Sequence, residues 1–327
     1  MPPWVVVGPG DDAAVIEPER GALEVLTTDA QVEGIHFDRR FVPPDAIGYR
    51  ALAVNLSDVA AMGARPRAAL LALALPDAME AADVDGLLDG MLALASTHGV
   101  ALIGGNITRT TGPLTIDVTA TGSVHRRRIL RRSGARPGDE VYVTGTLGDA
   151  AVGLRMLREK GAGLVFSEAD DEQKKQARLL FPTARYLRPE PRVRAGMLLG
   201  RNRAASSCMD LSDGLADAVR QVAAASGVGM TIDGGALPIS GASRAWHTAR
   251  GGDPVDTALT GGDDYELLFT VRPGHRGRLR GVQQLLAGLP ITRIGVVTKG
   301  TTLLLASGTS TRELPAGYQH FADRPTS

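Results

Sequence analysis

The pattern of hydrophobic and polar positions predicts alternating strands and helices in the first half of the chain. Strands are predicted where apolar residues run together or alternate with polar ones, and helices where they recur every three or four residues. The predicted strands cover residues 23–28, 68–75, 100–103 and 114–124. The predicted helices cover 44–58, stopping near Gly63, and 80–97, ending at Gly99, since glycine often follows a helix end.

The second half of the chain gives the same mixed pattern. Strands are predicted at 140–143, into Asp210, and near Met230, Leu267 and Ile294, and helices at 149–160, 171–180, 192–199 and 212–226. An arginine-rich stretch followed by Gly134 and Pro137-Gly138 marks a break at about residue 135. We therefore expect an α/β (α+β) protein with domains at 1–135 and 136–327.

Composition excludes several classes of protein. The 36 basic residues balance the 36 acidic ones, whereas a dedicated nucleic-acid-binding protein usually has a basic excess. Cys208 is the only cysteine, so neither an internal disulfide nor a cysteine-rich zinc site can form. The longest apolar run, 68–75, is far shorter than the roughly 20 residues that span a bilayer, and the first residues lack a signal-peptide pattern. We expect a cytoplasmic protein with no nucleic-acid or membrane partner.

Acidic residues gather in five short clusters, each near the junction of an apolar segment with a turn or helix start. Taken singly, each cluster has a structural explanation as a helix cap or a turn. Together they offer only oxygen ligands, which Mg²⁺ prefers, often with a phosphate. The clusters are Gly10-Asp11-Asp12, Thr27-Thr28-Asp29, Asn55-Leu56-Ser57-Asp58, Asp210-Leu211-Ser212-Asp213-Gly214 and Gly261-Gly262-Asp263-Asp264-Tyr265-Glu266.

Two further features bear on the chemistry. Asp58 lies in a predicted helix among apolar residues, with Asn55 on the same face, and such a carboxylate needs either an arginine or a metal ion as partner. The G-x-x-x-x-G-K-[ST] loop and the H-R-D and D-F-G pair of common kinases are absent. In a phosphoryl-transfer enzyme of this sequence, metal ions and arginine would have to neutralise the phosphates.

In this order and spacing, the motifs resemble those of the thiamine-monophosphate kinase family, within the aminoimidazole ribonucleotide synthetase-like ATP-binding superfamily. The resemblance runs from Gly8 to about Phe321. Its most specific stretches are 28–37, 51–64, 145–149 and 262–267. It implies a two-domain fold whose N-terminal strands form a barrel across a homodimer, with ATP and Mg²⁺ bound by the N-terminal domain.

The resemblance also implies an activity, in which ATP phosphorylates thiamine monophosphate to thiamine diphosphate by direct in-line transfer with several Mg²⁺ ions. No general base is expected, because the acceptor phosphate has a second pKa near ~6 and is largely ionised already. The implied metal ligands are Asp12, Thr27, Thr28, Asp29, Asp58, Asn106, Asp210 and Asp213. The implied ATP contacts are Gly105, Asn106, Arg132 and Ser212, and the implied substrate contacts are His36, Asp263 and Tyr318.

Each of the less distinctive residues also has a structural interpretation. His36 alone would be a packed or surface histidine, Arg132 part of a solvated basic face, and Tyr318 a core aromatic. The chain departs from many family members with Asn106 in place of Asp and from some with Asp263 in place of Glu. Asn106 keeps an oxygen but loses a charge, which predicts a metal site that is weaker or differently filled.

Two alternative functions stay open at the level of sequence. One is another ATP-dependent enzyme of the superfamily, although a selenophosphate synthetase needs a reactive residue near the N-terminus and the hydrogenase maturation factor needs a C-terminal cysteine. Cys208 is at neither position. The other is a catalytically inactive protein that binds nucleotide or metal.

Overall fold

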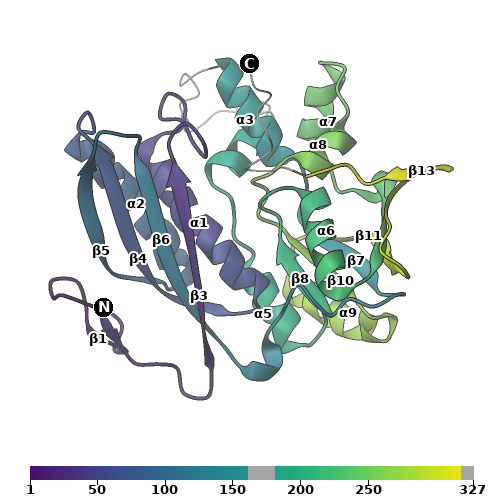
Figure 1. Cartoon of the computed structure of the whole chain (residues 1–327), viewed down its shortest axis with the longest axis horizontal. Coiled ribbons are helices and arrows are strands. Elements are labelled where there is room, and N and C mark those ends of the chain that lie inside the picture. Colours follow the sequence, from purple (N-terminus) through teal and green to yellow (C-terminus); the bar gives the residue numbers. More distant parts are fainter. Residues whose placement is uncertain (161–180, 318–327) are drawn as a thin grey trace. The chain divides into compact units, whose positions relative to one another are not determined.

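The computed structural model describes residues 1–160 and 181–317 and divides into two compact units (Figure 1). Among the described residues, the first unit comprises 1–130, 156–160 and 187–203, and the second comprises 131–155, 181–186 and 204–317. The predicted domain boundary at about residue 135 stays a prediction. The predicted helix at 171–180 lies outside the described residues. No helix in the described ranges is long and apolar enough to cross a membrane.

The first unit is built on a four-stranded sheet in the order β3-β6-β4-β5, in which only β4 and β5 run parallel. A two-stranded hairpin, β1-β2, precedes it. The elements are β1 (Val5–Val7), β2 (Val15–Ile16), β3 (Leu23–Val32), α1 (Pro44–Ala61), β4 (Arg65–Pro76), α2 (Ala81–His98), β5 (Ala101–Thr110), β6 (Thr115–Val124), the 3₁₀ turn η1 (Arg126–Arg128) and α5 (Val193–Arg201).

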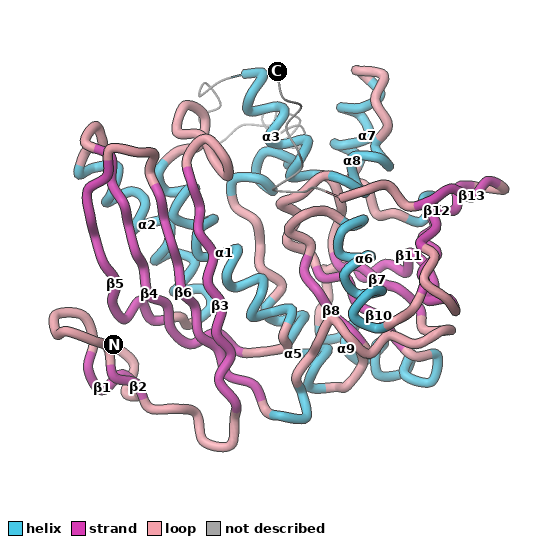
Figure 2. The backbone as a smooth tube through the Cα atoms, viewed as in Figure 1, coloured by secondary structure: helices cyan, strands magenta, loops and turns pink. Residues whose placement is uncertain are grey.

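Helices α1 and α2 pack together over one face of this sheet (Figure 2). Their backbones approach so closely that a Cβ atom on Gly48 would lie 1.8 Å from the carbonyl oxygen of Leu87. A Cβ atom on Gly90 would likewise lie 1.8 Å from the carbonyl oxygen of Asp45. Only glycine permits this approach. The helices cover the fully buried side chains of β6 at alternate positions, namely Ile116, Val118 and Ala120.

The second unit is built on a seven-stranded sheet in the order β13-β12-β9-β11-β7-β10-β8, antiparallel except between β12 and β9. Its core lies between this sheet and the apolar faces of α6 and α8. The elements are β7 (Glu140–Thr144), β8 (Ser207–Asp210), α6 (Leu215–Ser226), β9 (Gly229–Asp233), η3 (Gly234–Ala236), α7 (Gly241–Thr248), α8 (Pro254–Thr260), β10 (Leu267–Val271), η4 (Pro273–His275), α9 (Arg276–Leu285), β11 (Ile291–Thr298), β12 (Leu303–Ser307) and β13 (Ser310–Glu313). α3 (Asp149–Lys160) begins in the second unit.

The predicted elements of the first unit are all present. Helix α1 begins at Pro44 and ends just before Gly63, whose φ of 69° suits glycine. The expectation that a strand stops at Ile103, before the two glycines, is wrong, because β5 continues to Thr110. Hydrogen bonding to β4 carries the strand through Gly104 and Gly105, where side-chain pattern alone gives no strand signal.

Candidate functional site

The best-defined part of the site is a contact between β3 and α1. The hydroxyl of Thr27 donates a hydrogen bond of 2.5 Å to a carboxylate oxygen of Asp58. Asp58 is on the α1 face that covers the sheet, and Thr27 is on the side of β3 that faces the helix. One turn before Asp58, the amide nitrogen of Asn55 donates to the Ala51 carbonyl, while its buried oxygen has no partner among the described residues. Two predicted metal ligands, 31 positions apart, are thus adjacent.

Strand alternation puts Asp29 on the same side as Thr27, because residues two apart on a strand share a face. Thr28 faces the other way, where its hydroxyl contacts Asp117 at 3.0 Å and Thr119 at 3.1 Å. Asp29, Thr27 and Asp58 therefore lie on one side of β3, under α1, as a group of oxygen donors. Thr28 offers its side chain to the opposite, open face of the sheet.

Strand register places Asn106 on the same face of the sheet as Thr28, which is the face opposite Asp29. Asn106 pairs with Ala72, which pairs with Asp117, and residues directly opposite in a sheet share a face. β3 and β5 are also the two edges of the described sheet. Within one copy of the first unit, Asn106 and Asp29 thus occupy different faces and different edges.

The group formed by Thr27, Asp29 and Asp58 fits Mg²⁺ in its chemistry. All three side chains offer hard oxygen donors. Two oxygens on adjacent octahedral positions around Mg²⁺ lie about 3 Å apart, since each bond is roughly 2.1 Å. The Thr27–Asp58 oxygens, 2.5 Å apart, need little movement to reach that spacing.

The remaining predicted residues of the first unit are spread along its loops and edge. Asp12 is exposed in the β1–β2 loop, where its backbone N–H donates to the Asp11 carboxylate at 2.9 Å. His36 is half-buried after β3, and its Nδ1 accepts from the Val32 N–H at 3.0 Å. Gly105 lies in β5, so close to β4 that a Cβ atom would be 1.8 Å from the Leu71 carbonyl oxygen.

In the second unit, two predicted motifs form one loop pair. The backbone N–H of Asp263 donates to the Ser212 carbonyl at 2.7 Å, and that of Tyr265 donates to the Leu211 carbonyl at 2.9 Å. A Cβ atom on Gly262 would lie 2.6 Å from the Ser212 carbonyl oxygen. Asp210 at the end of β8 and Asp213 before α6 are therefore held beside the 261–266 loop.

Backbone geometry in this loop pair is unusual. Asp263 has a φ of 69° and Tyr265 a φ of 50°, in the left-handed region that non-glycine residues rarely adopt. The Tyr265 hydroxyl donates to the Asp263 carboxylate at 3.2 Å. Such conformations cost energy and persist where the surroundings enforce them, as at functional sites.

Of the remaining predicted ligand contacts, one is exposed in the second unit. Arg132 is exposed, and its guanidinium donates to the side-chain oxygen of Gln221 at 2.6 Å. Tyr318 lies outside the described residues. The single cysteine, Cys208, is buried, and burial raises the pKa of its thiol, which leaves it unreactive.

Sequence reasoning missed a buried polar network behind this loop pair. Adjacent Asp263 and Asp264 suggest a cation, but Asp264 is buried and accepts from the backbone N–H groups of Gly148 and Ala150 at 2.7 and 3.3 Å. Burial raises the pKa of Asp264 to about 8, so the carboxyl is largely protonated at neutral pH. Asp264 thus caps the N-terminus of α3. Because its carboxyl is largely protonated, it does not repel the neighbouring Asp263 as a full negative charge would.

Glu266 and Asp149 are the other acids of this network. Glu266 accepts from Arg185 at 2.7 Å and from the Thr144 hydroxyl at 2.6 Å. Asp149 accepts from the hydroxyls of Thr146, Ser240 and Ser243, each at 2.5 Å. The spacing Thr146-x-x-Asp149 at a helix start was the available sequence signal for a cap.

The titration of Asp264 predicts a pH dependence of stability. Its pKa is about 8 in the folded chain and about 4 in an unfolded one, so between these values the folded state holds one more proton. The associated stability is complete below about pH 4 and is lost as the pH rises through about 8. Wild type should therefore lose about 1.4 kcal/mol per pH unit between pH 5.5 and 7.5 relative to Asp264→Asn.

Urea unfolding at pH 5.5, 6.5 and 7.5 measures this difference. Trp246 fluorescence reports on the second unit once Trp4, the other tryptophan, is replaced by Phe in both proteins. Parallel pH profiles of wild type and Asp264→Asn would contradict a protonated, buried Asp264.

The predicted metal ligands are divided between the two units. Thr27, Asp29 and Asp58 belong to the first and Asp210 and Asp213 to the second. Across the described residues, no three His, Cys, Asp or Glu side chains form a ready metal cluster. The predicted metal ligands therefore form separate, incomplete groups. Among them, the Thr27 hydroxyl and the Asp58 carboxylate make the closest contact.

Comparisons with known proteins identify the family. Two family models match the chain, "AIR synthase related protein, N-terminal domain" over residues 10–124 and "AIR synthase related protein, C-terminal domain" over 136–305. The thiamine-monophosphate kinase of Salmonella typhimurium is 40% identical over 97% of this chain and 93% of its own length. The chain belongs to the thiamine-monophosphate kinase family. Its members are phosphotransferases, and the chain has their mixed α/β two-domain fold.

Solved structures agree with this assignment. The thiamine-monophosphate kinase from Stenotrophomonas maltophilia K279a superposes with a TM-score of 0.81 and 42% identity, over 93% of this chain and 91% of that one. "AaThiL complexed with AMPPCP and TMP" superposes with a TM-score of 0.75 and 33% identity, over 90% and 87%. The thiamine-monophosphate kinase of Bacillus subtilis is 36% identical over 97% of this chain and 94% of its own length.

Proposed function

We propose that this protein transfers the γ-phosphoryl group of ATP to the phosphate of thiamine monophosphate, giving thiamine diphosphate and ADP. The bond between the γ-phosphorus of ATP and the oxygen that bridges it to the β-phosphate breaks. A new bond forms between the γ-phosphorus and an oxygen of the acceptor phosphate. The Thr27–Asp58 contact carries the proposal, because it brings together two side-chain oxygens that could bind Mg²⁺, and both proposed substrates are polyanions. Thiamine-monophosphate kinases that match nearly the whole chain support the choice of acceptor.

The proposed mechanism is in-line transfer without a protein base. Thr27, Asp29 and Asp58 would hold Mg²⁺, with Asp12, Thr28, Asn106, Asp210 and Asp213 as further ligands. When bound, Mg²⁺ neutralises the phosphates and fixes their orientation. The chain's own task is to hold two anions in line, because the acceptor phosphate is already ionised near neutral pH. A cytoplasmic location, where ATP and Mg²⁺ are available, suits this reaction.

Residues of both units are proposed to contact the substrates. Gly105, Asn106, Arg132 and Ser212 would bind ATP. His36 and Asp263, with Tyr318, would bind thiamine monophosphate. The complex of AaThiL with AMPPCP and TMP supports this pairing of ligands.

Metal removal tests the proposal directly. Incubated with thiamine monophosphate, ATP and Mg²⁺, the protein is expected to form thiamine diphosphate, measured by chromatography. EDTA should abolish the product, and excess Mg²⁺ should restore it. Product formation that is unaffected by EDTA would contradict the metal-dependent mechanism. No product from a folded protein that binds ATP would indicate a different acceptor or an inactive protein.

We further propose a homodimer formed through the N-terminal sheet. The face of this sheet away from α1 and α2 carries exposed apolar side chains, with Leu26 69% and Leu70 39% exposed. A second copy could cover this face, closing the two sheets into a barrel without open edges. Thr28 and Asn106, on the same face, would then lie beside partner residues, which explains why they are separate from Asp29 in one copy.

Charge on this face is expected to disrupt the dimer. Leu26→Lys places an ammonium group in the proposed interface, so light scattering after gel filtration should give half the wild-type mass. Leu92→Lys, at an exposed position on α2, is the matched control and should leave the mass unchanged. A wild-type protein that is already monomeric would overturn the proposed interface.

A further inference from the structure

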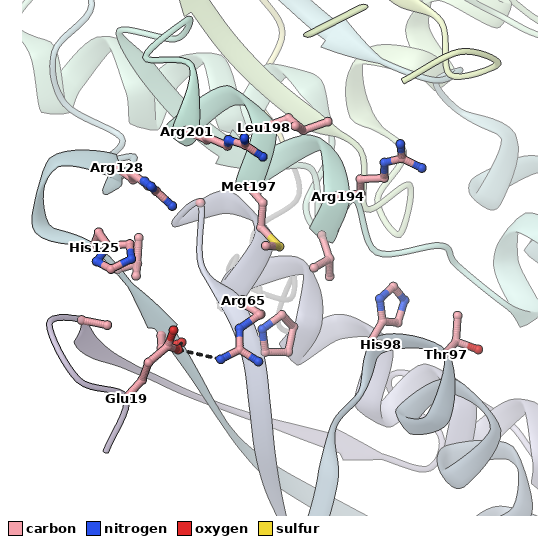
Figure 3. Close-up of a pocket in the computed structure, with 16 residues that line it drawn as sticks. Glu19, Arg65, Thr97, His98, His125, Arg128, Arg194, Met197, Leu198 and Arg201 are labelled. Carbon is pink, nitrogen blue, oxygen red and sulfur yellow. Dashed lines mark hydrogen bonds and ion pairs between the residues drawn. The ribbon is translucent and has the colours of Figure 1, made fainter. Parts of the chain in front are cut away.

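The first unit contains a pocket apart from the proposed catalytic residues (Figure 3). Its volume is about 550 Å³. It lies where β3 begins, β6 ends and the C-terminal ends of α1 and α2 meet α5. None of the residues proposed above to bind metal, ATP or thiamine monophosphate lines it. The pocket is therefore not explained by the proposed reaction.

Basic side chains dominate the polar lining. Four arginines and two histidines face one carboxylate, that of Glu19. Glu19 is already neutralised, because it pairs with Arg65 at 2.6 Å and accepts from the Ser123 hydroxyl. The hydrogen bond from Ser123 is the main cause that lowers the pKa of Glu19, so this carboxylate stays ionised and bound to its partners. The basic side chains are Arg65, Arg128, Arg194, Arg201, His98 and His125.

Two of these arginines are available for a ligand. Arg128 on η1 and Arg201 at the end of α5 are exposed side chains from elements 73 positions apart, which packing brings to one rim. In the part of the chain that the structure describes, neither has a carboxylate partner. Like charges gathered around a concave surface repel one another unless an anion lies between them.

The other side of the pocket is apolar. Val193, Met197 and Leu198 of α5 line it together with Pro66 and Val124. His98 adds a partly buried imidazole, and burial lowers its pKa, so it is neutral at pH 7 and can donate or accept a hydrogen bond. A concave site of this size with an apolar wall and a few convergent polar groups is typical of small-ligand sites.

We propose that this pocket binds a small organic phosphate, with its phosphate group on Arg128 and Arg201 and a compact apolar body against Val193 and Met197. Arginine suits a phosphate because its planar guanidinium donates two parallel hydrogen bonds. The apolar wall favours a ligand that has an organic body over a bare phosphate ion. The site is separate from the proposed catalytic site and does not depend on Mg²⁺.

Calorimetric titration in EDTA at pH 7 tests the proposal. The probes are pyrophosphate, phosphate and phenyl phosphate, since the last adds an apolar body to a single phosphate. We expect saturable binding of pyrophosphate that weakens with salt, and tighter binding of phenyl phosphate than of phosphate. EDTA keeps the proposed metal site from contributing, and Asp58→Asn should bind pyrophosphate as wild type does.

A matched pair of double variants distinguishes a site from general attraction. Arg128→Ala with Arg201→Ala should weaken pyrophosphate binding about ten-fold or more, because both proposed contacts are lost. Arg126→Ala with Arg127→Ala removes the same charge from η1 outside the pocket and should change the affinity less than about two-fold.

Three outcomes would overturn the proposal. They are no saturable binding by wild type, equal weakening in both double variants, and loss of binding in Asp58→Asn. Circular dichroism checks that the variants are folded, and Arg201→Glu provides a second variant that should weaken binding further. None of these results depends on turnover, so the pocket can fail while the proposed reaction holds, or the reverse.

Discussion

Replacement of Asp58 by asparagine is expected to reduce turnover of thiamine monophosphate about a thousand-fold. The amide keeps an oxygen that can accept the hydrogen bond from Thr27, so α1 and β3 should stay in contact. It removes the negative charge that a magnesium ligand supplies, and metal stabilisation of phosphoryl transfer is worth several kcal/mol. A loss of ~4 kcal/mol corresponds to about three powers of ten in rate.

Product formation over a range of Mg²⁺ concentrations measures the effect of Asp58→Asn. If the carboxylate binds metal, the variant should also need more Mg²⁺ to reach its own maximum rate. Asp85→Asn, an exposed acid on α2, is the matched control and should retain wild-type activity. Activity of Asp58→Asn within ten-fold of wild type would refute the metal-binding role of this carboxylate.

Replacement of Glu266 by glutamine is expected to destabilise the second unit by about 3–5 kcal/mol. The Glu266 side chain is fully buried, and it pairs with Arg185, whose side chain is only 9% exposed. The variant leaves the guanidinium buried without a counter-charge, and removing one member of a buried pair typically costs this much. The Thr144 hydroxyl, which also donates to Glu266, loses a charged acceptor as well.

Urea unfolding followed by Trp246 fluorescence, with Trp4 replaced by Phe, measures this loss in the second unit alone. The control is Asp256→Asn, which removes the same charge from an exposed pair with Arg312, at 54% and 55% exposure. Exposed pairs are worth about 1 kcal/mol or less, so the control should change little. If both variants lost equal stability, burial would not govern the strength of the Glu266–Arg185 pair.

Helices were predicted best where residues close in the sequence mark their ends. Pro44 and Gly63 bracket α1 in the sequence as they do in the structure, because chain stiffness and left-handed geometry act within a few residues. Helices α7, α8 and α9 were not predicted. They have 8, 7 and 10 residues, so apolar periodicity gives only a weak signal for each of them.

The candidate site was only partly predictable for a related reason. The sequence indicates that Thr27, Asp29 and Asp58 belong to one chemistry, but the pairing of Thr27 with Asp58 depends on how α1 lies across β3. The opposite placement of Asn106 depends on the register of four strands. Register follows from packing between distant residues, which a single sequence does not display.

The sequence by itself determined the family, the oxygen-only character of the proposed metal ligands and the mixed α/β class, since these rest on residue types and local spacing. Only the tertiary structure decided that Asp264 is a buried cap of α3 whose pKa burial raises to about 8. It alone gathered Arg65, Arg128 and Arg201 around one pocket. Burial and convergence arise when distant segments pack, so they set pKa values and binding sites that no stretch of sequence contains.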